Sequence, residues 1–344
     1  MKLGNIGDWG AGATPNRSNK SYYENGDVLW VKTGELNDGY IFDSIEKITT
    51  KALNECSLRN NNIGDVLIAM YGATIGKLGI AAVPLTTNQA CCACTPFSFI
   101  NNEYLFYYLM AIKPLLISKS YGGAQPNISK EKITNCFINF PKIDEQILIV
   151  NKIKELFKKI ETIDNEYNSI INLISATKRK VLEEIFGENS SYKSYYENYR
   201  PIRELCHTLS VTSKEVKLKD VKPEGKFPVV SQSKQLIDGY SDNQNNVISD
   251  IPIIIFGDHT RVVKYINFHF IPGADGTKIL KTINLESKYF YYGVLYASGI
   301  IDNKGYARHF SKLKNVLLPI PNKQNQNKIV KYLDNAFKLL DSIV

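Results

Sequence analysis

The chain has 344 residues, a net charge of +8 and 44% hydrophobic residues, which are ordinary values for a folded protein of about two domains. No apolar run reaches 18 residues and none follows Met1 closely, so we expect neither a membrane span nor a signal peptide. Cys91, Cys92 and Cys94 lie in an apolar run without the pair spacing of a zinc site. We therefore expect reduced cysteines in a core strand, no metal, and a cytoplasmic location.

The positive charge is concentrated in the second half of the chain. Residues 1–189 contain 20 Lys/Arg and 20 Asp/Glu, whereas residues 190–344 contain 22 Lys/Arg and 14 Asp/Glu. A modest basic surplus is typical of proteins that bind a polyanion, and nucleic acid is the commonest one.

The first 143 residues predict a compact module of short strands and helices. Val28–Val31 and Val66–Met70 are apolar runs of strand length, and Gly72–Ile80 has the pattern of a tight turn and a second strand. Asn102–Ile117 has helical length and should be kinked or end near Pro114.

Residues 144–187 predict one long spacer helix that stops at Gly187, followed by a polar linker at 188–198. Its stripe residues alternate in spacings of three and four, and nine of the eleven are apolar: Val150, Ile153, Phe157, Ile160, Asp164, Tyr167, Ile171, Ile174, Lys178, Val181 and Ile185. This pattern is typical of a coiled-coil seam, and the helix should span about 60–65 Å. A helix of this length needs a partner, and residues 324–344 carry the same pattern.

The second part of the chain repeats the first. The helix entry Pro141-Lys142-Ile143-Asp144-Glu145-Gln146 returns 180 positions later at 321–326, with Asn325 in place of Glu145. Phe106–Tyr108 matches Phe290–Tyr292, and the run 251–256 corresponds to the strand at Val66. The order predicts a second module at 199–320 and a short helix copy at 321–344, either naturally short or truncated.

Several motifs together resemble one family. They are Lys-Leu-Gly-Asn-Ile at 2–6, Gly-Ala-Thr-Pro at 12–15, Trp-Val-Lys-Thr-Gly-Glu-Leu at 30–36, Gly-Asp-Val-Leu-Ile-Ala-Met-Tyr-Gly-Ala-Thr-Ile-Gly-Lys at 64–77, Thr-Thr-Asn-Gln-Ala at 86–90, Gly-Ala-Gln-Pro-Asn-Ile-Ser at 123–129 and Phe-Pro-Lys-Ile-Asp-Glu-Gln at 140–146. Over essentially the whole chain this order closely resembles the specificity (S) subunit of type I restriction–modification enzymes. The second module is a more divergent version, with Phe-Gly-Asp-His-Thr-Arg at 256–261.

The resemblance implies an α+β fold with two target-recognition domains separated by an antiparallel pair of long helices. Each domain would read one half of a bipartite, asymmetric double-stranded DNA target. The helices would dock two methyltransferase subunits, and a restriction translocase–nuclease subunit would complete the complex. The helix residues expected to meet these partners are Gln146, Val150, Phe157, Tyr167, Ile174, Gln326, Val330 and Phe337.

Chemistry is not expected from the chain itself, and no cofactor is predicted. There is no Pro-Pro pair for an adenine methyltransferase turn, and Gly76-Lys77-Leu78 lacks the hydroxyl of a phosphate-binding loop. Glu215-Val216-Lys217 lacks the Asp of a nuclease site, and the four histidines are scattered. The alternative function is a non-catalytic helical-repeat scaffold that assembles protein partners without reading DNA.

DNA contacts are predicted at basic and amide side chains in loops, because Lys and Arg bind phosphates and Arg, Lys, Asn and Gln read base edges. The candidates are Arg17, Lys20, Lys32, Lys77, Gln125, Asn127, Lys214, Lys217, Lys219, Gln232, Lys234, Arg261, Lys304, Tyr306, Arg308 and His309.

Overall fold

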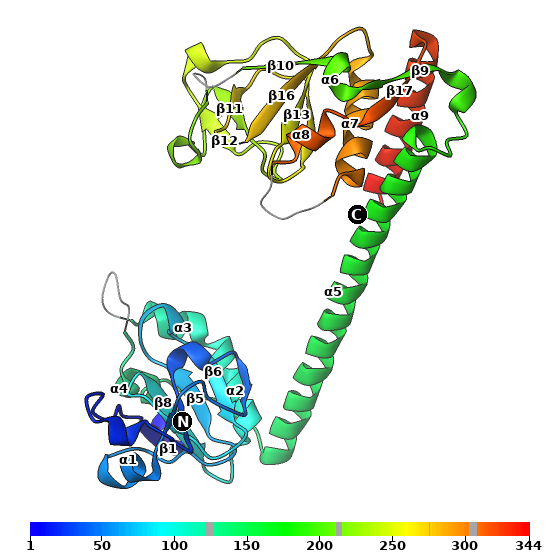
Figure 1. Cartoon of the computed structure of the whole chain (residues 1–344). Coiled ribbons are helices and arrows are strands. Elements are labelled where there is room, and N and C mark those ends of the chain that lie inside the picture. Colours follow the sequence, from blue (N-terminus) through cyan, green and yellow to red (C-terminus); the bar gives the residue numbers. More distant parts are fainter. Residues whose placement is uncertain (121–126, 211–214, 275, 303–307) are drawn as a thin grey trace. The chain divides into compact units, whose positions relative to one another are not determined.

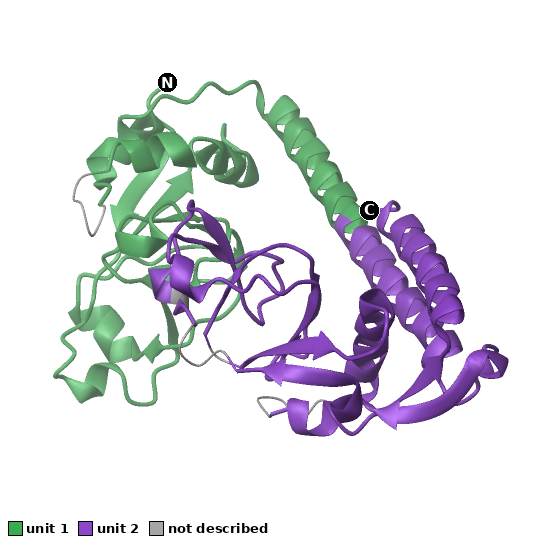
Figure 2. Cartoon of the chain, turned by 90° about the horizontal axis from the view of Figure 1, so that it is seen from above, with its two compact units in different colours: residues 1–163 green, residues 164–344 purple. Residues whose placement is uncertain are grey.

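The computed structural model describes residues 1–120, 127–210, 215–274, 276–302 and 308–344. The chain forms two compact units, Met1–Ile163 and Asp164–Val344, which Figure 2 shows in two colours. The boundary lies within the helix α5 (Ile143–Phe186), so each unit includes part of it. Helices and strands are mixed in both units, as the predicted α+β class requires (Figure 1). Among the residues that the structure describes, no helix is long and apolar enough to cross a bilayer.

The first unit is built on a five-stranded sheet in the order β1-β8-β5-β6-β3, beside a smaller sheet, β4-β2-β7. The pair β3–β6 is parallel, as is β2–β7, and the other pairs are antiparallel. The strands are β1 (Gly7–Ala11), β2 (Val28–Val31), β3 (Gly39–Ile41), β4 (Lys47–Ile48), β5 (Val66–Ala69), β6 (Leu78–Ala81), β7 (Thr86–Thr87) and β8 (Cys91–Pro96). The helical elements are η1 (Leu3–Asn5), η2 (Lys20–Tyr22), η3 (Thr33–Glu35), α1 (Thr50–Glu55), η4 (Gly72–Thr74) and α4 (Lys130–Thr134).

Both faces of the main sheet are covered, which explains the continuous apolar runs. Along β5, Val66 and Ile68 enter one core cluster, whereas Leu67 and Ala69 enter another, as the two-residue period of a strand dictates. All three cysteines of β8 are buried free thiols, as predicted. Burial raises the pKa of Cys91 and of Cys92 to about 12.

The predicted helix at 102–117 is divided into α2 (Asn102–Ala111) and α3 (Lys113–Ser118). Pro114 lies in the first turn of α3, where its missing N–H costs nothing, so the break falls just before it. The Asn101 side chain caps α2 by accepting a hydrogen bond from the Tyr104 N–H at 2.9 Å. The break near Pro114 is therefore confirmed.

The second unit repeats this architecture. Its main sheet, β10-β16-β13-β14, has the strand order of β1-β8-β5-β6, and the small sheet β12-β11-β15 again contains one parallel pair. The strands are β9 (Tyr196–Pro201), β10 (Cys206–Leu209), β11 (Phe227–Val230), β12 (Gly239–Ser241), β13 (Ile253–Gly257), β14 (Val263–Ile266), β15 (Ile271–Pro272), β16 (Thr277–Thr282) and β17 (Leu317–Pro321). The helical elements are η5 (Lys193–Tyr195), α6 (Ile202–Leu205), η6 (Leu218–Asp220), η7 (Gln244–Asn246), α7 (Ser287–Ile300), α8 (Phe310–Leu313) and α9 (Lys323–Asp341).

The two long helices are unequal and antiparallel where they meet. Leu333 near the middle of α9 packs in one core with Ile185 near the end of α5. Asp341 at the end of α9 pairs with Lys178, further back along α5, so the two helices run in opposite directions. The lengths are 44 residues for α5 and 19 for α9.

The spacer helix ends at Phe186, as predicted from Gly187. A Cβ on Gly187 would lie 2.4 Å from the carbonyl oxygen of Glu183, so the close approach of the backbone requires glycine at this position.

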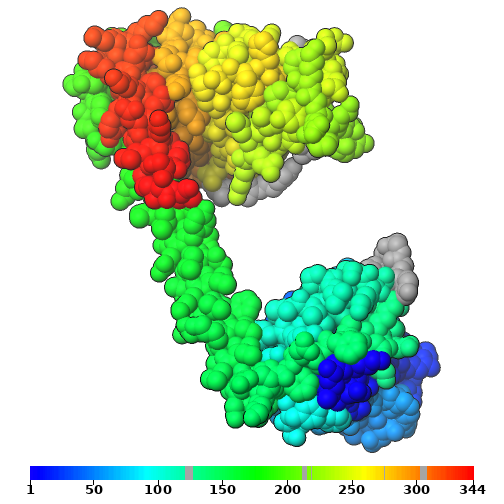
Figure 3. Space-filling model, turned by 180° about the vertical axis from the view of Figure 1, so that it is seen from behind, coloured from blue at the N-terminus to red at the C-terminus, as the bar shows by residue number. Residues whose placement is uncertain are grey.

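The seam predicted along α5 is covered only in part. Val150 is buried, but Phe157, Ile160 and Tyr167 are each at least half exposed. Figure 3 shows α9, in red, beside the end of α5 alone. The pairing with the C-terminal helix is therefore limited to the end of α5, because α9 has 19 residues against 44 in α5.

Candidate nucleic-acid interface

The first unit presents a cluster of cations held against aromatic rings. The Arg17 guanidinium lies 4.8 Å from the Trp30 ring centroid and 4.6 Å from that of Tyr23. The Lys32 ammonium lies 5.7 Å from Trp30. Both cations pair with Glu46, and the hydrogen bond from Arg17 is the main cause of the lowered pKa of that carboxyl. Stacking and pairing hold Arg17 in one orientation while its side chain remains 51% exposed.

The other described candidates of this unit, Lys20, Lys77 and Asn127, lie on three separate segments. Lys20 begins η2 and is exposed, as is Asn127, whose backbone pairs with that of Tyr71. Lys77 follows the turn that contains η4 and is half-buried. The Tyr71–Asn127 bridge joins the segment of Asn127 to the start of the turn that precedes Lys77. Gln125 lies outside the described residues.

In the second unit, residues 257–261 form the turn that corresponds to the turn with η4. Hydrogen bonds hold this turn against the rest of the unit. The Arg261 guanidinium donates to the carbonyl oxygens of Ser298 at 3.4 Å and Ile301 at 2.9 Å, at the C-terminal end of α7. The Gln232 amide oxygen accepts from the His259 N–H at 3.1 Å. These contacts give Arg261 and Gln232 structural roles that their position in a loop does not reveal.

The remaining candidates of the second unit divide by exposure. Lys217, Lys219, Lys234 and Arg308 are exposed and available to a polyanion. The side chain of His309 is only 1% exposed, and a buried imidazole cannot meet a base edge without rearrangement. Residues outside the described part of the chain are Lys214, Lys304 and Tyr306.

Sequence reasoning missed the role of two buried glutamines. Gln146 is fully buried; its amide oxygen accepts from the Asn101 N–H at 2.9 Å, and its amide nitrogen donates to the carbonyls of Phe99 at 3.0 Å and Pro141 at 2.9 Å. It therefore joins the N-cap of α2 to the start of α5. The strict repetition of this glutamine in the two helix entries is the signal that could have revealed it.

Gln326 repeats two of these three contacts in the second unit. Its amide oxygen accepts from the N–H of Glu286, the N-cap of α7, at 2.8 Å, and its amide nitrogen donates to the Pro321 carbonyl at 2.8 Å. The expectation that Gln146 and Gln326 face protein partners is therefore wrong, because both amides are buried and bind backbone groups of their own unit.

The other predicted partner-binding residues differ in exposure. Val150 and Val330 are buried, at 2% and 9% exposure. Phe157 and Tyr167 are 50% and 53% exposed, which leaves apolar surface open on α5. Ile174 and Phe337 are half-buried.

Comparison with known proteins identifies the family of this repeated architecture. The family model described as the type I restriction modification DNA specificity domain matches residues 1–172 and 196–343. The chain belongs to this family, with one match in each half.

Relatives in the family match part of the chain. A type I restriction enzyme MjaIX specificity subunit from Methanocaldococcus jannaschii is 31% identical over 208 residues, which is 59% of this chain and 44% of the relative. The EcoR124I/EcoR124II specificity subunit from Escherichia coli is 27% identical over 168 residues, 47% of this chain and 41% of the relative. The match thus spans less than half the length of either relative.

Solved structures share the fold over nearly the whole chain. A structure described under complex assembly and conformational transition of the type I R-M system has a TM-score of 0.72 at 16% identity, covering 100% of this chain and 90% of that one. The HsdS subunit from Thermoanaerobacter tengcongensis has a TM-score of 0.57 at 16% identity, covering 99% and 89%. At this identity the likeness concerns the fold.

Proposed function

We propose that this protein is the non-catalytic DNA sequence-recognition subunit of a type I restriction–modification complex, and that it binds a bipartite, asymmetric target. The observation that supports this most is the repeated module, with four strands in the same order in both main sheets but different loop sequences. Two like scaffolds with unlike loops suit a target with two unlike halves. The proposed target-recognition domains are residues 1–143 and 199–320, and 144–187 is the proposed spacer.

Affinity for DNA would come from the exposed cations of both modules. In the first module these include Arg17 and Lys20, and in the second Lys217, Lys219 and Arg308. Cations that neutralise phosphates release counterions, so binding should weaken steeply as salt is raised.

The long helix offers a surface for protein subunits. Apolar residues of the α5 stripe that stay open to solvent include Phe157, Ile160, Tyr167 and Ile171, which are 36–53% exposed. An apolar stripe of this kind is typical of a helix that packs against a partner. We propose that methyltransferase subunits, two per complex, bind here, and that a restriction translocase–nuclease subunit joins them in the cytoplasm.

The test is enrichment of bound sequences from a pool of random duplexes, using the chain together with its methyltransferase partner. Recovery of two short, unlike blocks at a fixed separation supports the proposal. A single contiguous block would contradict the bipartite target, and no enriched sequence would favour the alternative of a protein-assembling scaffold.

A further inference from the structure

Each module contacts its long helix through a carboxylate that holds one lysine and one tyrosine. In the first unit, the Glu103 carboxylate of α2 lies 2.5 Å from the Lys154 ammonium of α5 and accepts a hydrogen bond from the Tyr40 hydroxyl at 2.6 Å. Burial opposes ionisation of Glu103, but the hydrogen bonds from Lys154 and Tyr40 outweigh it and lower its pKa. The carboxylate is therefore a charged, engaged group at the junction of module and helix.

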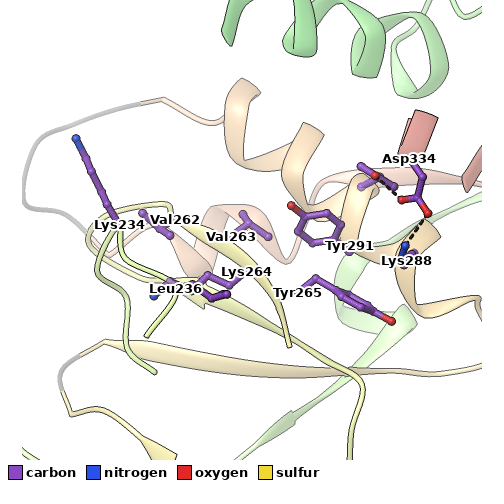
Figure 4. Close-up of a pocket in the computed structure, with 10 residues that line it drawn as sticks. Lys234, Leu236, Val262, Val263, Lys264, Tyr265, Lys288, Tyr291 and Asp334 are labelled. Carbon is purple, nitrogen blue, oxygen red and sulfur yellow. Dashed lines mark hydrogen bonds and ion pairs between the residues drawn. The ribbon is translucent and has the colours of Figure 1, made fainter. Parts of the chain in front are cut away.

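The second unit has the same three groups with the charges exchanged. Here the carboxylate is Asp334 on the long helix α9, and the lysine is Lys288 on the module helix α7, 2.6 Å away. The Tyr292 hydroxyl donates to Asp334 at 2.8 Å. Figure 4 shows the pair of Lys288 and Asp334 as a dashed line, in a cavity that is also lined by Tyr265 and Tyr291.

The four charged residues occupy equivalent positions of the repeat. Glu103 lies two residues after Asn101, the N-cap of α2, and Lys288 lies two residues after Glu286, the N-cap of α7. Lys154 and Asp334 each lie eight residues after the buried glutamine of their helix, Gln146 or Gln326. The ion pair therefore lies at the same position in both copies, but the carboxylate and the lysine have exchanged helices.

The helix dipole does not account for this reversal. A lysine in the first turn of a helix opposes the positive N-terminal end of the dipole, whereas a glutamate there is favourable. Lys288 in α7 is therefore in an unfavourable position for its own helix, and Asp334 is the group that compensates for it.

We propose that these reversed pairs match each recognition module to its own long helix. The buried glutamines are the same in both copies and would accept either module, so they cannot distinguish the two. If the modules were exchanged, Glu103 would face Asp334 and Lys288 would face Lys154, and like charges would replace each pair. The modules of this chain are then not interchangeable, although their scaffolds are.

The significance for target recognition rests on the proposed function. A module seated correctly on its helix holds its DNA-reading loops at a fixed angle to that helix. A mismatched pair would weaken the contact between module and helix, so the chain would accept a wider range of separations between half-sites.

The experiment imitates an exchange one pair at a time in the full-length chain. Lys154→Asp gives α5 the charge of α9, and Glu103→Lys gives α2 the charge of α7. Each single variant should lower the unfolding midpoint of the first unit by about 2–4 °C, because it removes an ion pair and also sets two like charges against each other. The double variant should regain at least half of the loss.

Lys158→Asp is the matched control, since Lys158 is exposed one turn further along α5 and its substitution makes the same change in net charge. It should leave the midpoint within about 1 °C of the parent, as expected for a surface substitution away from such contacts. A double variant no more stable than the weaker single variant, or a control that loses as much, would overturn the proposal. The same cycle with Asp334→Lys and Lys288→Glu tests the second unit.

A DNA measurement then separates this proposal from the proposed function. On duplexes whose half-sites differ in separation, Lys154→Asp should broaden the accepted range, and adding Glu103→Lys should narrow it again. If all variants accept the same range of half-site separations although the double variant regains stability, the link to recognition is refuted. Absence of specific binding by the parent chain would instead refute the proposed function, while the stability cycle would still decide whether modules and helices are matched.

Discussion

The buried glutamines at the two helix entries give the sharpest stability prediction. Gln146→Leu keeps the volume of the side chain but removes the partners of the Asn101 N–H and of the Phe99 and Pro141 carbonyls. With a cost of about 1 kcal/mol for each lost partner, the free energy of unfolding of the first unit should fall by about 3 kcal/mol. Gln326→Leu breaks two such bonds and should cost the second unit about 2 kcal/mol.

The assay is chemical denaturation monitored separately for the two units, combined with hydrogen exchange at the amides of Asn101 and Glu286. Two compact units permit two transitions, so each variant should move one and leave the other in place. Gln324→Leu is the matched control, because Gln324 is exposed on the same helix as Gln326. This control should change the free energy of unfolding by no more than about 0.5 kcal/mol.

Gln146→Glu tests how the free energy of unfolding of the first unit depends on pH. A carboxylate facing two carbonyl oxygens should have a pKa above that of the unfolded chain, because burial and repulsion both disfavour its charge. The variant should therefore be most stable below the unfolded pKa of about 4.3 and lose stability as pH rises. The reasoning is refuted if the leucine variants cost no more than Gln324→Leu, or if the glutamate variant gains stability with rising pH.

Three further predictions concern charge, docking and thiols. Arg17→Ala should weaken DNA binding and reduce the slope of log affinity against log salt by about 1. Glu46→Gln frees two cations and should strengthen binding. Binding titrations in which both variants change the affinity in the same direction would contradict this. Phe157→Glu should abolish co-purification of the methyltransferase subunit while changing the free energy of unfolding by only about 1 kcal/mol, since its ring is half exposed and stacks on Tyr107. In thiol labelling of the folded protein, only the half-buried Cys56 should react. In denaturation at a series of pH values, the free energy of unfolding should fall as pH rises above about 9, because the buried thiols of β8 keep protons that the unfolded chain loses.

Much of the fold could be predicted because its signals are local. The strand runs such as Val66–Ala69, the break before Pro114 and the helix stop at Gly187 each depend on neighbouring residues. The duplication could be read from spacing alone, since an offset of 180 positions survives even where side chains have changed.

The candidate interface was less predictable, because exposure depends on which long-range contacts a side chain makes. A loop position suggested DNA contact for Arg261, but the structure directs its guanidinium to the end of α7. The family resemblance suggested partner contact for Gln146 on the long helix, but its side chain binds the backbone at the N-cap of α2. Periodicity gives the face of a helix and not the group that covers it.

The sequence by itself determined that the chain holds two copies of one module, joined by a long helix and followed by a shorter helix copy. These are properties of pattern and length, and they need no contact between distant residues. Only the tertiary structure decided that Lys154 meets Glu103, that Asp334 meets Lys288, and that α9 leaves most of α5 open. The physical reason is that an ion pair or a covered face exists only when two distant segments pack, and packing fixes which side chains are turned toward each other.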